Sequence, residues 1–223
     1  NARVLAVDLS LSSLSYALRK TEELRLSSIE YAQGDILELG SLGRRFDLVE
    51  CIGVLHHLSD PLAGWRVLLD LLRPGGLMKI GLYSEIARRA IIDGRSLIDE
   101  KGYTTSSQDI RQCRQDIITM AEAGNRTMAE ICNGGDFFSL SNCRALLFYV
   151  KEHRFTLPQI TAALQKLDLK FLGFELRDQR VLKMFKISHP STSALTSLSL
   201  WHEFELENPD TFRGIYQFWC RKM

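Results

Sequence analysis

The chain has 223 residues, of which 45% are hydrophobic and 25% charged, and its formal net charge is +1. This composition is typical of a water-soluble globular protein with one sizeable core, so we expect one domain with an insertion. The low net charge gives no long-range attraction to nucleic acid or to an anionic membrane, and no apolar run reaches the roughly 18 residues that a membrane-spanning helix needs. Five cysteines without metal-type spacing are typical of reduced thiols, and we expect a cytoplasmic location.

The first residues are predicted to form a strand, a helix and a second strand. Arg3–Leu9 is the first strand, and the helix begins in a serine-rich segment and runs to Leu26. Asp8 lies at the tip of the first strand, where a carboxylate can accept hydrogen bonds from both hydroxyls of a ribose. The alternative is that Asp8 only caps the next helix. Ile29–Ala32 is the second strand, and Gly34-Asp35-Ile36 follows it.

The segment Phe46–Tyr83 is the organising unit of the chain. Phe46–Ile52 is a short apolar, β-branched run, as expected of a strand that is buried on both faces. Asp60-Pro61 begins a helix, and its apolar positions, Trp65 among them, recur at a spacing that predicts one face packed on the sheet. A Pro-Gly-Gly turn separates this helix from the strand Leu77–Tyr83. Two strands joined in this way form a right-handed βαβ unit of a parallel sheet, whose ligands bind beyond the carboxyl ends of the strands.

The following 65 residues are too long for a simple connection, and we predict a helical insertion that forms a lid. Ser84–Lys101 and Ser106–Ala123 are expected to be helices, the second with a good N-terminal cap. Asp136–Tyr149 is expected to be one helix with an aromatic flank, more typical of a core than of a cage around a substrate. Three arginines could bind an acidic substrate or occupy an exposed helix face: Arg88, Arg89 and Arg95.

The last third of the chain returns to alternating helices and strands. Thr156 begins a helix over Gln159–Leu167, and Leu169–Leu176 reads as a strand. Two more helices are expected, over Arg177–His189 and over Ser193–Asn208, the latter capped by the serine-rich cluster at 191–193. The aromatic, β-prone segment at 214–221 is the expected final strand.

Three motifs in this order resemble class I S-adenosylmethionine (SAM)-dependent methyltransferases: VLAVDLS at 4–10, YAQGDILEL at 31–39, and FDLVECIGVLHHLSDP with LLRPGGLMKIGLY within 46–83. The resemblance covers residues 1–85, and the rest is similar in plan to the methyltransferase region that follows tetratricopeptide repeats in some bacterial proteins. It implies a Rossmann-like α/β fold whose sheet is mostly parallel, with one antiparallel strand between the fifth and sixth strands. The implied parts are a SAM-binding core at 1–84, the helical insertion at 85–150, and the rest of the core at 151–223.

The resemblance also implies that the chain uses SAM and releases S-adenosylhomocysteine. The cofactor would be held at the carboxyl ends of three strands by Asp8, Leu9, Gly34, Asp35, Ile36, Gly53, Val54 and Leu55. In the family, the acid of the first motif holds the ribose. The acid of the second motif accepts a hydrogen bond from the adenine amino group, and the next apolar residue packs on the ring. Main chain at the start of the third loop contacts the methionine part.

Three residues are candidates for orienting or deprotonating the methyl acceptor: His56, His57 and Tyr83. A histidine can act as a general base because its ordinary pKa lies near working pH. For His57 the favoured alternative is that its ring fixes the loop by a hydrogen bond to the backbone around Asp60. We expect no metal site, because ligands at neighbouring positions point apart and no third Cys, His or acid cluster accompanies them.

The sequence departs from the family at one point. Nothing matches the first strand and its Gly-rich loop, which would be expected just before Asn1 and which lets main chain approach the cofactor closely. We therefore expect a fragment of a longer protein, with an empty position between the strands Arg3–Leu9 and Phe46–Ile52. Residues upstream, such as an N-terminal repeat domain, or a second chain would fill that position.

The sequence leaves the acceptor open between a small molecule, a lipid-like quinone precursor and a protein side chain, and nucleic acid is the least favoured. A non-catalytic binding module that keeps the fold and has lost the cofactor loop is the alternative function, with the helical insertion as its partner surface. A nicotinamide dehydrogenase also places an acid after its second strand, but it explains neither the LHHLSDP loop nor the RPGG turn.

Overall fold

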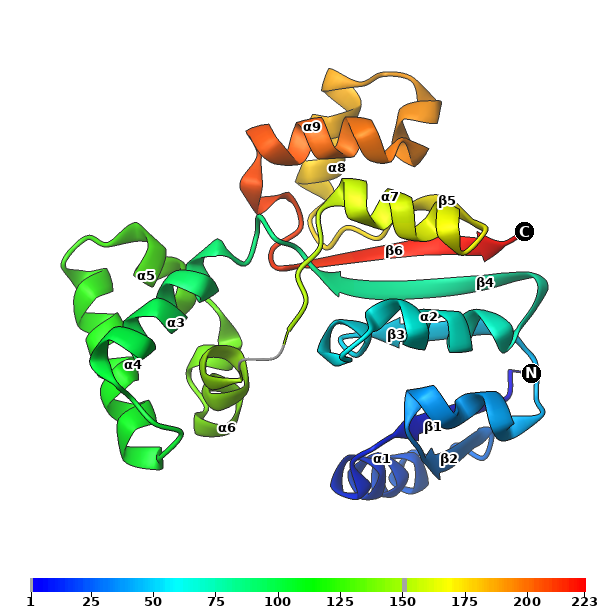
Figure 1. Ribbon diagram of the computed structural model, residues 1–223, viewed down its shortest axis with the longest axis horizontal. Helices are drawn as coiled ribbons and strands as arrows, with labels where there is room; N and C mark the ends of the chain where they lie inside the picture. The colour runs from blue at the N-terminus through cyan, green and yellow to red at the C-terminus, as the bar shows by residue number, and fades with distance from the viewer. Residues whose placement is uncertain (1, 150–151) are drawn as a thin grey trace.

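The structure is a computed structural model that describes residues 2–149 and 152–223. It contains a four-stranded sheet with helices packed around it, a small N-terminal unit and a helical lobe (Figure 1). The lobe, drawn in green, lies beyond the arrowhead of the strand β4 (Leu72–Tyr83), which is the carboxyl end of that strand. Within the described ranges, no helix is long and apolar enough to cross a bilayer.

The N-terminal unit is a βαβ arrangement of β1 (Val4–Asp8), α1 (Leu11–Glu23) and β2 (Ile29–Gln33), with the two strands parallel. Ser10 begins α1 by accepting a hydrogen bond from the backbone N–H of Ser13, which satisfies one of the free donors of the first turn. A 3-10 turn follows β2 over Ile36–Leu42.

The main sheet has the strand order β3-β4-β6-β5. Its strands are β3 (Phe46–Ile52), β4, β5 (Leu169–Phe174) and β6 (Ile215–Lys222). β3 and β4 are parallel, and β6 runs antiparallel to both of its neighbours, β4 and β5. β4 and β5 correspond to the fifth and sixth strands of the methyltransferase family, so the prediction of one antiparallel strand between them is confirmed.

Four helices pack around this sheet: α2 (Pro61–Asp70), α7 (Leu157–Lys166), α8 (Gln179–Ser188) and α9 (Leu198–Glu207). Trp65 on α2 is fully buried, as predicted, and its Nε1 lies 3.2 Å from the sulfur of Met78 on β4. The expected cap of the last long helix at 191–193 is wrong. A 3-10 turn occupies Thr192–Thr196, and Ser197 caps α9 because its side chain accepts from the N–H of Leu200.

The helical lobe has an apolar core of its own, formed by α3 (Arg89–Lys101), α4 (Ser107–Glu122), α5 (Arg126–Cys132) and α6 (Leu140–Cys143). The single helix expected over 136–149 is wrong. It is divided into a 3-10 turn at Gly135–Phe137, α6, and a π-turn at Arg144–Phe148. Ser139 causes the break by accepting from the N–H of Asn142, since a local cap competes with continuation of the helix.

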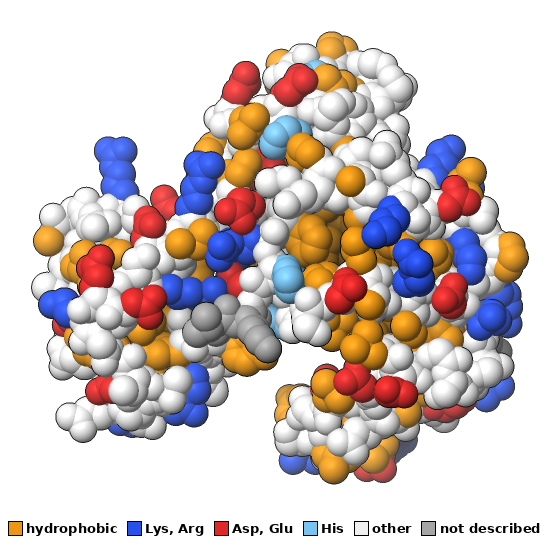
Figure 2. Space-filling model, in the orientation of Figure 1, with side chains coloured by type: hydrophobic (Ala, Val, Ile, Leu, Met, Phe, Trp, Pro, Cys, Tyr) orange, Lys and Arg blue, Asp and Glu red, His pale blue; other side chains and the backbone are white. Residues whose placement is uncertain are grey.

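Among the described residues β1 pairs only with β2, and β3 only with β4, so the two sheets are separate. The expectation that β3 is buried on both faces is wrong: Leu48 is 48% exposed, and Val4 on β1 is 46% exposed. A strand with a neighbour on one side only leaves its other edge open to solvent. Hydrophobic side chains gather on both sides of the space between the N-terminal unit and the main sheet (Figure 2).

Candidate functional site

Two carboxylates lie at the carboxyl ends of the neighbouring strands β1 and β2. Asp8 ends β1, and Asp35 follows β2 by one residue beyond Gly34. Oδ1 of Asp8 accepts from the N–H of Ser10 at 2.7 Å, and Oδ1 of Asp35 accepts from the N–H of Leu37 at 2.9 Å. These local bonds hold both carboxylates in place, and neither Oδ2 atom is hydrogen-bonded to another described residue. Both second oxygens are available to accept from a ligand.

The loop after β3 contributes a backbone surface at the same edge of the fold. Gly53 has a φ of +81°, in the left-handed region that glycine tolerates best, and the space that a Cβ would fill there is open. Val54 is 44% exposed, whereas the Leu55 side chain is fully buried under α2. Leu55 therefore anchors the loop while Gly53 and Val54 stay at the surface. Ile36 is buried with the main core, and Leu9 is 63% exposed.

The ring of Tyr83, at the end of β4, is the centre of a stack. The His56 imidazole lies against it at a centroid distance of 3.7 Å, and the Arg88 guanidinium lies 3.9 Å from its centroid. His56 is fully buried, and neither ring nitrogen has a hydrogen-bond partner among the described residues. Burial is the main reason why the pKa of His56 falls to about 3, and the nearby Arg88 guanidinium contributes to that shift. His56 is therefore a neutral, packed ring.

His57 is only half-buried and lies among three other rings. Its centroid is 4.4 Å from that of His56, 5.7 Å from that of Tyr83 and 5.4 Å from that of Tyr149, all in edge-to-face geometry. Tyr149 belongs to the helical lobe and is 50% exposed. The prediction that the aromatics of this segment belong to a core therefore holds for Phe137 and Phe148, but it is wrong for Phe138 and Tyr149, which are both exposed.

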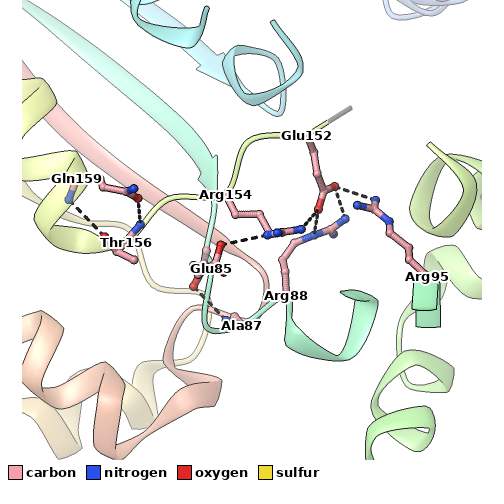
Figure 3. A network of polar contacts seen from close by, with 9 residues as sticks. Glu85, Ala87, Arg88, Arg95, Glu152, Arg154, Thr156 and Gln159 are labelled. Carbon is pink, nitrogen blue, oxygen red and sulfur yellow. Dashed lines mark hydrogen bonds and ion pairs between the residues drawn. The ribbon is translucent and has the colours of Figure 1, made fainter. Parts of the chain in front are cut away.

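A buried carboxylate, Glu152, joins the lobe to the sheet (Figure 3). Arg88 donates to both of its oxygens, from Nε at 3.2 Å and from Nη2 at 2.7 Å, and Arg95 donates from Nη2 at 3.0 Å. Arg154 lies 3.9 Å from Glu152 and bonds to Glu85 at 3.1 Å. The exposed-face alternative for Arg88 and Arg95 is wrong, because Glu152 holds both in a buried cluster where a charge needs a partner.

The residues after Glu152 form a strap across the carboxyl end of β4. The N–H of His153 donates to the carbonyl of His56 at 2.7 Å, and the N–H of Phe155 donates to the carbonyl of Tyr83 at 2.8 Å. The N–H of Glu85 donates back to the carbonyl of Phe155 at 2.9 Å. This strap fixes the His56 loop and the end of β4 to each other.

A second buried acid supports the same end of β4 from α9. Glu205 is fully buried and accepts hydrogen bonds from the Ser84 hydroxyl at 2.8 Å and from the Tyr216 hydroxyl at 2.8 Å and 2.9 Å. Burial raises the pKa of Glu205. Because both hydroxyls donate to it, the Glu205 carboxylate has its hydrogen bonds satisfied and holds α9 against the end of β4.

Sequence reasoning missed Glu152, Glu205 and the role of the strap. Glu152 and Arg88 are 64 positions apart, and neither belongs to a motif, so their meeting is set by the path of the chain through the lobe. A weak signal existed: a Glu between two basic residues at the point where a helical insertion returns to the sheet.

Comparison with known proteins agrees with this arrangement. Residues 1–78 match the family model described as a methyltransferase domain. An uncharacterized protein of Synechococcus sp. is 28% identical over 218 residues, which cover 92% of this chain and 51% of that protein. The ubiquinone biosynthesis O-methyltransferase of Cereibacter sphaeroides is 35% identical over 77 residues, or 34% of this chain and 31% of that protein.

Among solved structures, PKMT2 from Rickettsia typhi in complex with AdoHcy has the same fold, with a TM-score of 0.71 and 15% identity over 98% of this chain and 43% of that one. The strand order and this likeness define the fold as that of class I SAM-dependent methyltransferases: a Rossmann-like, mostly parallel sheet with one antiparallel strand. The chain spans about half the length of the Synechococcus protein, 51%, and less of the other two.

Proposed function

We propose that this chain is part of an enzyme that transfers a methyl group from SAM to an acceptor. The observation that carries the proposal is the carboxyl edge of β1, β2 and β3. Two carboxylates with available oxygens end β1 and follow β2, and a left-handed glycine with open space around it follows β3. Ligands of open α/β sheets bind at this edge. The methyltransferase-domain match over residues 1–78 spans the same three strands.

The residues at this edge fit SAM. The available oxygen of Asp8 suits a ribose hydroxyl, and that of Asp35 suits the adenine amino group. Gly34 and Ile36 flank Asp35, and Leu9 extends from the tip of β1, so we assign these three residues to contacts with the nucleoside. The backbone from Gly53 to Leu55 suits the methionine part, because no side chain blocks its approach at Gly53.

When bound, SAM supplies a methyl group on a sulfonium sulfur, which leaves as a neutral thioether when an acceptor atom attacks the methyl carbon in line. The chain contributes position and the exclusion of water. We assign the acceptor side to His57 and Tyr83, which lie beyond β3 and at the end of β4 and are each only partly buried. His56 is too deeply buried to receive a proton from an acceptor, so we assign it the task of holding the Tyr83 ring.

The proposed site requires a further strand between β1 and β3. Strands in a sheet lie about 4.8 Å apart, so a missing neighbour leaves N–H and C=O groups without partners, at about 1–3 kcal/mol for each one that is buried. The exposed apolar side chains of Val4 and Leu48 on the two facing strands are consistent with a position that another strand covers. We infer that this strand comes from an upstream segment, such as an N-terminal repeat domain, or from a second chain.

The test is calorimetric titration of SAM into the full-length natural protein and into two variants. Asp8→Ala removes the proposed ribose acceptor, and we expect at least a tenfold weaker affinity for SAM, or about 1.4 kcal/mol. Asp47→Ala is the matched control, since Asp47 is an exposed acid at the opposite end of β3 that pairs with Arg73. Equal affinities for all three proteins would remove the ribose assignment.

A further inference from the structure

The helical lobe carries an open groove on its π-turn. The groove has a volume of about 400 Å³ and is lined by Thr105, Ser141, Arg144, Ala145, Phe148 and Tyr149. Pockets that hold small molecules usually measure about 300–1,000 Å³, so this one can accept a ligand of the size of a substituted aromatic ring. In Figure 1, α6, which leads directly into the π-turn, lies on the side of the lobe that faces the sheet.

The π-turn decides which side chains reach the groove. Leu147 and Phe148 point into the core of the lobe, while Arg144 and Ala145 stay exposed. A π-turn adds one residue to a helical turn and is frequent at functional sites. As a result, the buried Phe148 and the half-exposed Tyr149 both line the groove.

Among the described residues, the groove is lined by one cation and no acid. Arg144 makes no hydrogen bond or ion pair with any described residue, and none of the five other lining residues is charged. This distinguishes Arg144 from the nearby Arg88, Arg95 and Arg154, whose charges are taken up by Glu152 and Glu85. A guanidinium with its donors available is suited to a carboxylate, which it can bind with two parallel hydrogen bonds.

The groove is connected to the proposed transfer site through Tyr149. This residue lines the groove, and its ring centroid is 5.4 Å from that of His57, which in turn lies 5.7 Å from that of Tyr83. A molecule whose anionic group binds Arg144 can lie along the Tyr149 ring with its other end directed toward His57.

We propose that this groove binds the methyl acceptor and that the acceptor is a small aromatic carboxylate. That the ligand is the methyl acceptor rests on the proposed function, whereas the chemical class of the ligand rests on the groove alone. Arg144 binds the carboxylate, Phe148 and Tyr149 contact the ring, and the hydroxyls of Thr105 and Ser141 are placed to bond polar substituents.

The experiment uses the full-length natural protein without SAM and 3,4-dihydroxybenzoate as the probe, with catechol as its uncharged counterpart. Binding is followed by calorimetry and by NMR shifts of the backbone amides. We expect the benzoate to bind at least tenfold more tightly than catechol and to shift the amides of Thr105, Ser141 and Tyr149. Arg144→Gln should bring the benzoate to the affinity of catechol, while the control Arg111→Gln, at an exposed position on α4, should leave it unchanged.

A second variant keeps the test decisive if Arg144→Gln is poorly folded. Tyr149→Ala removes a half-exposed ring and should weaken both probes to a similar extent. Equal affinity for benzoate and catechol in the natural protein, or full benzoate binding by Arg144→Gln, would overturn the proposal. Because this experiment contains no SAM, its result does not depend on the proposed function. If the separate titration shows no SAM binding, the groove would still bind an aromatic carboxylate, but that ligand would not be a methyl acceptor.

Discussion

The burial of His56 allows us to predict how much the free energy of unfolding falls in acid. Its ring is inaccessible and has no hydrogen-bond partner among the described residues, so a proton on it would place an unpaired charge in the core. In the unfolded chain the same imidazole titrates with an ordinary pKa of 6.5, against about 3 in the fold. Below pH 6.5 the unfolded state therefore binds a proton that the folded state does not bind.

The sign and size follow from this difference in pKa. The contribution of a neutral buried histidine to stability is complete above pH 6.5 and is lost progressively as the pH falls toward 3. Between pH 7.5 and pH 5, this single group should lower the free energy of unfolding by about 2 kcal/mol. Other residues also titrate over this range, so the informative quantity is the difference between the natural protein and a variant.

The variant is His56→Gln, which removes the titrating ring. Urea unfolding of both proteins at pH 7.5 and pH 5 gives four free energies, and the variant should lose about 2 kcal/mol less than the natural protein between the two pH values. An NMR titration of the natural protein should show that the His56 ring stays neutral down to pH 5. Equal acid losses in the two proteins, or a His56 ring that titrates near pH 6.5, would refute the argument.

Three further substitutions test the packing that supports the site. Trp65→Ala removes a fully buried side chain and should lower the free energy of unfolding by about 3–5 kcal/mol; melting like that of the natural protein would refute the position of α2. Glu152→Gln leaves buried guanidinium groups without their carboxylate and should cost about 3–5 kcal/mol in urea unfolding, whereas the exposed control Glu30→Gln should change the stability little. Gly81→Ala places a Cβ 2.7 Å from Cγ2 and 3.0 Å from Cα of Ile52, and should cost about 1–3 kcal/mol; an unchanged unfolding midpoint would contradict this spacing of β3 and β4.

The strands and the edge at which a cofactor would bind could be predicted from sequence, because they depend on local patterns. An apolar run that ends in an acid or a glycine marks both a strand and its carboxyl tip, as at Asp8 and Gly53. The antiparallel placement of the last strand came from the resemblance to a family and is what the structure shows.

The acceptor side could not be predicted in the same way. The Glu152 cluster joins segments that are 57 and 64 residues apart in the sequence. The contacts of His56 and Arg88 with the Tyr83 ring depend on how the loop after β3 and the start of the helical lobe meet at the end of β4. The π-turn was missed because Ser139 restarts a helix inside a segment whose composition is helical throughout. The exposure of Leu48 could not be anticipated from its strand alone, since it depends on whether a neighbouring strand is present.

The proposed cofactor site is best tested by a crystal structure of the full-length natural protein with S-adenosylhomocysteine. We expect the ribose hydroxyls within hydrogen-bond distance of Asp8, adenine beside Asp35 and Ile36, and the amino-acid part along Gly53 and Val54. We also expect a strand between β1 and β3. Ligand bound elsewhere, or clear density at this edge with Asp8 turned away from the ribose, would show that the proposed site is wrong.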